Sequence, residues 1–282
     1  APLSFQQQRM YVLTRLDQTK YNYNVVEVAR LSGRLDVAAF EASIAALCER
    51  HEILRSTFCE RLGEPTQRAD AAMPRLEHVD LKGCAKGERE TAIRREALRL
   101  AHHQFDLEHE PPVKARLLRF SATDHALVIN IHHLVTDGWS QRLFWQELEA
   151  HYAASRTGRV AALPPLAFQY RDFAAWQQDW AATLAAKEQL SYWRRQLDGV
   201  TTLPLRTDRP RPQTWSGRGA RHYIEFAQGL SARLRSLSQA RGVTPFMTLL
   251  AAFQCLLYRY TGHEDVAIGS LMAGNARGVR SL

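Results

Sequence analysis

An apolar run that ends in two histidines constrains the fold of this chain more than any other stretch. Residues 126–131 have the composition of a strand buried in a protein core. His132 and His133 follow the run directly, and Asp137 comes four residues after His133. We predict that both imidazoles lie where this strand leaves the core, with a carboxylate one short loop away. Histidine transfers protons near neutral pH, so the loop suits acid–base chemistry; by itself it also fits a buried histidine pair that caps a strand.

Hydrophobic periodicity divides the rest of the chain into alternating helices and strands, which is typical of an α/β protein. The predicted helices are residues 4–13, 36–49, 87–105, 140–152, 170–197, 231–241 and 244–260. The predicted strands are residues 25–31, 65–68, 74–79, 113–121, 126–131, 221–226 and 265–271. Ser4, Asp36 and Ser140 are predicted to be helix N-caps because their short polar side chains accept hydrogen bonds from the first turn.

Length, charge and cysteine content limit the classes of protein. A chain of 282 residues is long enough for two domains, and no apolar run reaches the roughly 20 residues of a membrane span. The net charge of +8 comes from scattered Lys and Arg rather than from a dense basic run, so we expect acidic protein partners and no nucleic acid. The four cysteines have no C-x-x-C spacing, which predicts free thiols, no metal site and a cytoplasmic location.

The stretch His132-His133-Leu134-Val135-Thr136-Asp137-Gly138 resembles the core motif of nonribosomal peptide synthetase condensation domains, which belong to the chloramphenicol acetyltransferase-like superfamily. Three further stretches resemble motifs of that family, in the family's order. They are the Ser4 to Arg9 segment, residues 50–58 and residues 170–176. The resemblance covers nearly the whole chain.

The resemblance implies two chloramphenicol acetyltransferase-like lobes in a V, each a mixed sheet flanked by helices. We expect residues 1–180 to form the N-terminal lobe with the histidine motif, and residues 181–282 a linker helix and the first part of an incomplete C-terminal lobe. The family's next motif, Ile-Gly-x-Phe-Val-Asn, would follow at about Leu282, so either the chain is truncated or further residues follow it. A truncated chain would have half a tunnel and would be expected to be inactive. The family also has Arg where Asn275 stands, so either Arg277 substitutes as the partner of Asp137 or that pair is absent.

The same resemblance implies a peptide-bond-forming acyltransferase with His133 as its catalytic residue. His132, Asp137 and Gly138 are expected to support the motif. Trp139 and Ser140 are candidates for lining the substrate tunnel. A further set of basic residues is expected to be structural: Arg9, Arg50, Arg55 and Arg277.

The expected partners are an upstream donor and a downstream acceptor peptidyl carrier domain, and an adjacent adenylation domain. Substrates would arrive on phosphopantetheine arms of the carriers, with no cofactor bound directly. Several other functions stay open: an epimerisation domain, an ester-forming or cyclisation relative, a coenzyme A-dependent acyltransferase, or a non-catalytic recruitment domain. The continuation Trp139-Ser140-Gln141 favours condensation over epimerisation, whose motif continues Val-Ser-Trp, and His132 is Asp in cyclisation domains.

Overall fold

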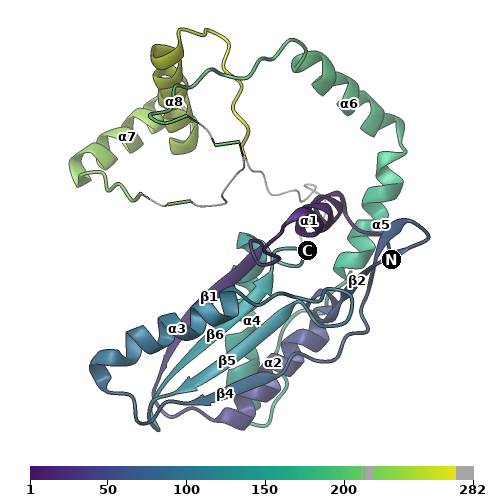
Figure 1. Ribbon diagram of the computed structural model, residues 1–282, viewed down its shortest axis with the longest axis vertical. Coiled ribbons are helices and arrows are strands. Elements are labelled where there is room, and N and C mark those ends of the chain that lie inside the picture. The colour runs from purple at the N-terminus through teal and green to yellow at the C-terminus, as the bar shows by residue number, and fades with distance from the viewer. Residues whose placement is uncertain (211, 214–218, 221, 271–282) are drawn as a thin grey trace. The chain divides into compact units, whose positions relative to one another are not determined.

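The computed structural model describes residues 1–210, 212–213, 219–220 and 222–270 (Figure 1). It divides into two compact units, Ala1–Glu188 and Gln189–Gly274, and residues up to 270 of the second unit are described. The boundary that we predicted at residue 180 stays a prediction. Arg277 and Asn275 lie outside the described residues.

A mixed four-stranded sheet forms the centre of the first unit. Its strands are β1 (Asn24–Ser32), β4 (Leu76–Asp80), β5 (Val113–Arg119) and β6 (Asp124–His132), in the order β1-β6-β5-β4. β6 pairs antiparallel with both β1 and β5, and β4 runs parallel to β5. The four predicted strands in this region are confirmed, and the histidine-bearing strand lies between two neighbours.

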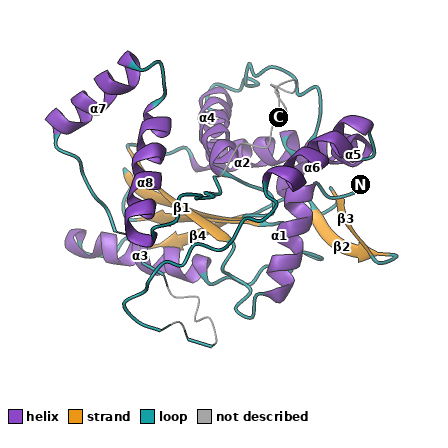
Figure 2. Ribbon diagram, turned by 90° about the horizontal axis from the view of Figure 1, so that it is seen from above, coloured by secondary structure: helices purple, strands orange, loops and turns teal. Residues whose placement is uncertain are grey.

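Helices cover both faces of this sheet (Figure 2). Helix α3 (Arg89–Ala101) packs on one face, while α2 (Val37–Arg50) and α4 (Gly138–Ser155) cover the other. Successive β6 side chains point to opposite faces, so Val128 joins the core under α3 and Ile129 joins the core under α2 and α4. Because both faces are covered, β6 is a continuous apolar run rather than an alternating one.

The N-terminal helix and a small hairpin complete the amino-terminal part of this unit. They are α1 (Phe5–Leu16), the 3₁₀ turn η1 (Glu52–Arg55) and the strands β2 (Thr57–Arg61) and β3 (Glu64–Arg68). Ser4 caps α1 as predicted. Phe5 is 40% exposed, and Gln7 and Tyr11 are the buried residues of this helix. Strand β2 is absent from the sequence prediction, in which the preceding helix ends at residue 49 and the next strand begins at residue 65.

Later helices differ from the sequence prediction in two ways. A turn, η2 (Lys86–Glu88), precedes α3, and the single helix expected over residues 170–197 is broken into α5 (Tyr170–Ala181) and α6 (Leu184–Gln196). Within α5, Phe173 is buried, whereas Trp176 is 43% exposed and stacks on Trp180.

The second unit contains helices α7 (Gln228–Ala240) and α8 (Pro245–Thr261). The strands predicted at residues 221–226 and 265–271 are wrong where they are described, since residues 222–226 and 265–270 are not in strands. A strand needs a hydrogen-bonded neighbour, and none lies within the described part of this unit. No single described helix is long and apolar enough to cross a membrane; α7 and α8 pass that test only as a pair bent by 103°. All four cysteines are free, as predicted.

Candidate active site

The motif loop runs from the end of β6 to the start of α4, and its backbone is anchored to both neighbouring strands. The His132 N–H donates to the Pro112 carbonyl (2.9 Å), next to β5, and the His133 N–H donates to the Tyr23 carbonyl (2.8 Å), next to β1. Val135 N–H then donates back to the His132 carbonyl (3.0 Å) and closes a tight turn. The position of His133 is therefore fixed by main-chain hydrogen bonds rather than by its side chain.

The two imidazoles have opposite environments. The His132 side chain is 1% exposed and packs edge-on against Phe105, with ring centroids 5.9 Å apart. Its Nδ1 accepts a hydrogen bond from the Leu134 N–H (3.1 Å). Burial, with a smaller contribution from His133, lowers the pKa of His132 to about 4, so its ring is neutral at pH 7. His133 is exposed and free to meet a reactant.

Asp137 is the N-cap of α4. Its Oδ1 accepts hydrogen bonds from the Ser140 N–H (2.8 Å) and the Ser140 hydroxyl (2.7 Å). The prediction that Ser140 caps this helix is therefore wrong: the helix starts at Gly138, two residues earlier. A carboxylate at this position is favoured because it satisfies free N–H groups and meets the positive end of the helix dipole.

Gly138 and Trp139 leave an open surface in front of the α4 N-terminus. A Cβ built on Gly138 meets no described atom within 4 Å, and Trp139 is 61% exposed. Gly138 does not have a positive φ. Neither backbone strain nor packing in the described residues requires a glycine at this position.

An ion-pair cluster joins α4 to the end of α2. Glu147, which is 5% exposed, accepts from Arg50 Nε (3.1 Å) and lies 2.6 Å from His51 Nε2. Burial raises the pKa of Glu147, but hydrogen bonds and charge from His51 and Arg50 outweigh it, so the net pKa is lowered. Arg50 also donates to the Pro164 carbonyl (2.6 Å). These contacts support a bracing role for Arg50.

The other basic residues expected to be structural differ in their surroundings. Arg55 donates to the Ala69 carbonyl (2.7 Å) and lies 4.0 Å from Glu52. Arg9 is exposed, and its side chain makes no hydrogen bond or ion pair with the described part of the chain. Arg277 lies outside the described residues, so its pairing with Asp137 stays a prediction.

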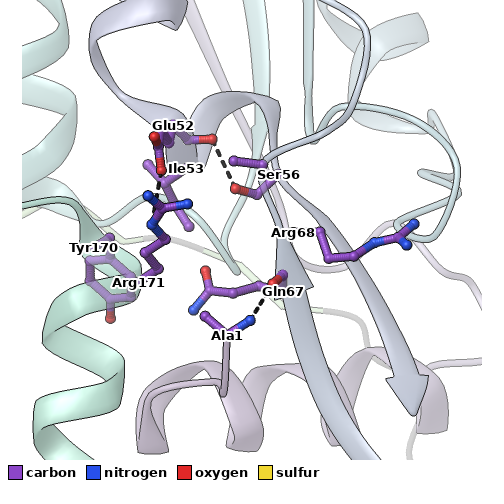
Figure 3. Close-up of a pocket in the computed structure, with 9 residues that line it drawn as sticks. Ala1, Glu52, Ile53, Ser56, Gln67, Arg68, Tyr170 and Arg171 are labelled. Carbon is purple, nitrogen blue, oxygen red and sulfur yellow. Dashed lines mark hydrogen bonds and ion pairs between the residues drawn. The ribbon is translucent and has the colours of Figure 1, made fainter.

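A cavity of about 250 Å³ lies apart from the motif loop (Figure 3). Its lining includes Glu52, Gln67, Tyr170 and Arg171, and the Arg171 Nε lies 3.2 Å from the Glu52 carboxylate. No residue of the histidine motif, residues 132–138, lines this cavity. We therefore take the surface around His133, the exposed imidazole of the histidine motif, as the candidate active site rather than this cavity.

Sequence reasoning missed several residues that hold the site. Tyr23 supplies the carbonyl that fixes His133, and Asn24 and Asn130 are polar residues on the α3 face of the sheet, with Asn130 fully buried. A polar side chain inside the apolar run 126–131 was a visible signal for Asn130. Nothing local marked Tyr23, because its role comes from strand pairing. Among the described residues, no group of three His, Cys, Asp or Glu side chains is placed to hold a metal ion.

The sequence matches the condensation domain family over residues 1–277. The chain belongs to this family, the condensation domains of nonribosomal peptide synthetases, which catalyse acyl transfer. It is 44% identical over 278 residues to a linear gramicidin synthase of Brevibacillus parabrevis, covering 98% of this chain and 4% of the relative. It is 39% identical over 283 residues to a probable non-canonical nonribosomal peptide synthetase, CymA, of Salinispora arenicola, covering 98% of this chain and 4% of that protein.

Among solved structures, the chain is similar to the X-domain in its complex with OxyB from teicoplanin biosynthesis. The TM-score is 0.79 at 31% sequence identity, covering 92% of this chain and 57% of that one. The predicted fold class is thereby confirmed, with a second lobe that is incomplete within this chain. The chain spans 4% of the length of these two curated relatives and somewhat over half of the solved domain.

Proposed function

We propose that this chain is the part of a condensation domain that carries the catalytic histidine for peptide-bond formation. One observation carries the proposal: the exposed His133 side chain stands on a backbone that is anchored at the end of β6. A reactive group on a fixed main chain needs little reorganisation when the reactants arrive.

The reaction joins two thioester-linked groups held by different carriers. The amine nitrogen of the acceptor aminoacyl group attacks the carbonyl carbon of the donor thioester, and a C–N bond forms. Collapse of the tetrahedral intermediate breaks the C–S bond and releases the donor carrier's thiolate. The imidazole of His133 positions the amine and accepts the proton that its nitrogen loses, and that proton then passes to the thiolate.

We further propose that the N-terminus of α4 assists the developing oxyanion. Asp137 engages the Ser140 N–H, while the N–H groups of Gly138 and Trp139 precede it in the first turn of the helix. Free N–H groups at a helix start favour negative charge. We assign the open surface beside Gly138 to the donor thioester, and the exposed ring of Trp139 to the wall of its tunnel.

The partners follow from this reaction. Donor and acceptor peptidyl carrier domains deliver both substrates on phosphopantetheine arms, and an adenylation domain next to this chain loads the acceptor carrier. These arms are substrates, so the protein itself binds no cofactor in this scheme. The chain would act in the cytoplasm, as part of a longer synthetase.

The test is a single-turnover assay of the complete domain with a donor and an acceptor loaded on carriers, read by mass spectrometry of the product. His133→Ala is expected to abolish amide formation while leaving the melting temperature unchanged. His78→Ala is a matched control, because His78 is a half-exposed surface histidine paired with Glu41. Product formation by His133→Ala at the rate of the control would overturn the assignment.

A second candidate is a recruitment domain that binds a partner enzyme without catalysing condensation. The observation that favours it is the similarity to the X-domain, which was solved in a complex with OxyB. Such relatives often lose a motif histidine, whereas His132 and His133 are both present. An intact domain that binds a partner enzyme but forms no amide with loaded carriers would favour this candidate.

A further inference from the structure

Three buried polar atoms without a hydrogen-bond partner in the described residues lie together on the α3 face of the sheet. They are Asn24 Oδ1, Asn130 Oδ1 and His132 Nε2. Asn24 lies directly opposite His132 in the β1–β6 register, and Asn130 precedes His132 by two residues on the same strand. Directly opposed side chains have Cβ atoms about 5 Å apart, and residues two apart on a strand point to the same face.

The orientation of both asparagine amides is fixed by what they contact. The Asn24 Nδ2 donates to the carbonyls of Ala101 (2.8 Å) and His103 (2.7 Å). The Asn130 Nδ2 donates to the Leu100 carbonyl (2.6 Å). A carbonyl can only accept, so each amide nitrogen must face the end of α3. Each Oδ1 is therefore a buried acceptor that points away from the helix.

The tautomer of His132 is fixed by the same reasoning. The Leu134 N–H can only donate, so His132 Nδ1, which lies 3.1 Å from it, must be the unprotonated nitrogen. Because the buried ring is neutral at pH 7, its single proton is on Nε2. The cluster thus contains one donor, the His132 Nε2–H, and two acceptors, the asparagine Oδ1 atoms. Asn130 is 0% exposed and His132 is 1% exposed.

We propose that Asn24, Asn130 and His132 form a site for one buried water molecule, and that this site positions His133. The water accepts a hydrogen bond from the Nε2–H of His132 and donates one to each asparagine Oδ1. Three bonds are the usual complement of an internal water, and each bond satisfies a group that would otherwise be buried unpaired. The positioning role rests on the proposed function of His133, whereas the water site does not.

The water site acts on the two backbone segments that hold His133. By holding the proton on Nε2, the water keeps Nδ1 available to the Leu134 N–H, which follows His133 in the chain. In the other tautomer Nδ1–H would face Leu134 N–H, and two donors would oppose each other. On the other side, Asn24 follows Tyr23, whose carbonyl accepts from the His133 N–H.

The direct test is a crystal structure of the complete condensation domain in which ordered water is resolved. We expect one water about 2.7–3.2 Å from each of the three atoms. The proposal is overturned if no water is found there, or if an asparagine Oδ1 bonds directly to His132 Nε2. Neither result depends on turnover, so failure of the proposed reaction would be distinguishable from failure of the water site.

The positioning role is tested with Asn130→Leu, which keeps the volume but removes the acceptor. In ¹⁵N-histidine NMR we expect His132 to change from the pure Nε2–H form to a mixture of tautomers. The kcat of amide formation should fall about 10- to 100-fold, the range that a small misplacement of a reacting group produces, while KM is unchanged. Asn130→Ser, which keeps an oxygen acceptor and leaves room for a second water, should restore the Nε2–H form and most of the kcat.

Ser43→Ala is the control for this series. The Ser43 hydroxyl is fully buried and donates to the Phe40 carbonyl on α2, away from the sheet face that carries the three atoms. This variant should change neither the His132 tautomer nor kcat. If Asn130→Leu keeps the pure Nε2–H form and the kcat of the control, the positioning role is wrong.

Discussion

Asp137 Oδ1 accepts two hydrogen bonds from one residue, Ser140, through its N–H at 2.8 Å and its hydroxyl at 2.7 Å. This contact makes the motif aspartate a helix cap, placed four residues after the candidate catalytic histidine. Its carboxylate is engaged with the first turn of α4. We therefore attribute its role to holding the loop rather than to transferring a proton.

We predict that Asp137→Ala lowers the free energy of unfolding by about 1 kcal/mol, the usual cost of removing a helix N-cap. Asp137→Asn should lower the free energy of unfolding much less, because asparagine caps a helix about as well as aspartate. Urea denaturation of the complete domain measures both. Asp36→Ala is the matched control: Asp36 caps α2 through the Ala39 N–H (3.0 Å), so it should cost similar stability but leave amide formation intact. An unchanged unfolding free energy for Asp137→Ala would count against the capping role.

The stability of the domain should fall as the pH drops from 6.5 towards 4. The pKa of His132 is lowered to about 4 in the folded state, from 6.5 in the unfolded state, so the unfolded chain binds more protons in this window. The neutral His132 ring makes its full contribution to the free energy of unfolding above pH 6.5. As much as about 3 kcal/mol of that free energy is lost by pH 4. Denaturation at pH 7 and pH 5 measures the slope.

His132→Asn isolates this contribution, because asparagine can accept from the Leu134 N–H but does not titrate in this range. Burial also lowers the pKa values of His125 and His151, so the stability of the unmodified domain and of the variant share a part of their pH dependence. The variant should therefore show a flatter dependence on pH than the unmodified domain. Identical slopes would show that His132 does not titrate with a lowered pKa.

Removing the carboxylate of Glu147 should destabilise the contact between α2 and α4. Glu147→Ala leaves Arg50 and His51 without their buried acceptor, and breaking such a pair costs about 3 kcal/mol. Glu149→Ala, on the exposed side of the same helix, is expected to change stability by less than about 0.5 kcal/mol. Chemical denaturation measures the free energy of unfolding of both variants. Equal values for Glu147→Ala and Glu149→Ala would mean that the ion-pair cluster makes no net contribution to stability.

Gly138→Ala should fold normally and yet react slowly. Apart from its chain neighbours and the backbone of α4, no described atom lies within 4 Å of the added methyl group, so the melting temperature should stay within error of the unmodified domain. If the donor thioester lies beside this residue, the methyl group blocks it and the KM for the donor carrier rises. An unchanged KM for the donor carrier would show that the donor thioester does not bind beside Gly138.

Local sequence determined the strand at the motif, the caps at Ser4 and Asp36, and the family of the chain. Each of these depends on a short pattern: an apolar run, an oxygen before a helix, or a motif with fixed spacing. That the two imidazoles point to opposite sides also follows locally, because neighbouring residues on a strand alternate in direction. Both faces of β6 are covered, so the exposure of His133, one residue beyond the strand, was decided by the tertiary structure.

Only the tertiary structure decided what holds the histidine loop. Tyr23, Asn24 and Glu147 are distant in sequence from the groups they bind, and pairing or packing of whole elements brings them together. The start of α4 likewise depended on which of two caps, Asp137 or Ser140, had the right backbone geometry. The strands predicted near residues 222–226 and 265–270 failed for the same physical reason, since a strand forms only where a neighbouring strand can accept and donate its hydrogen bonds.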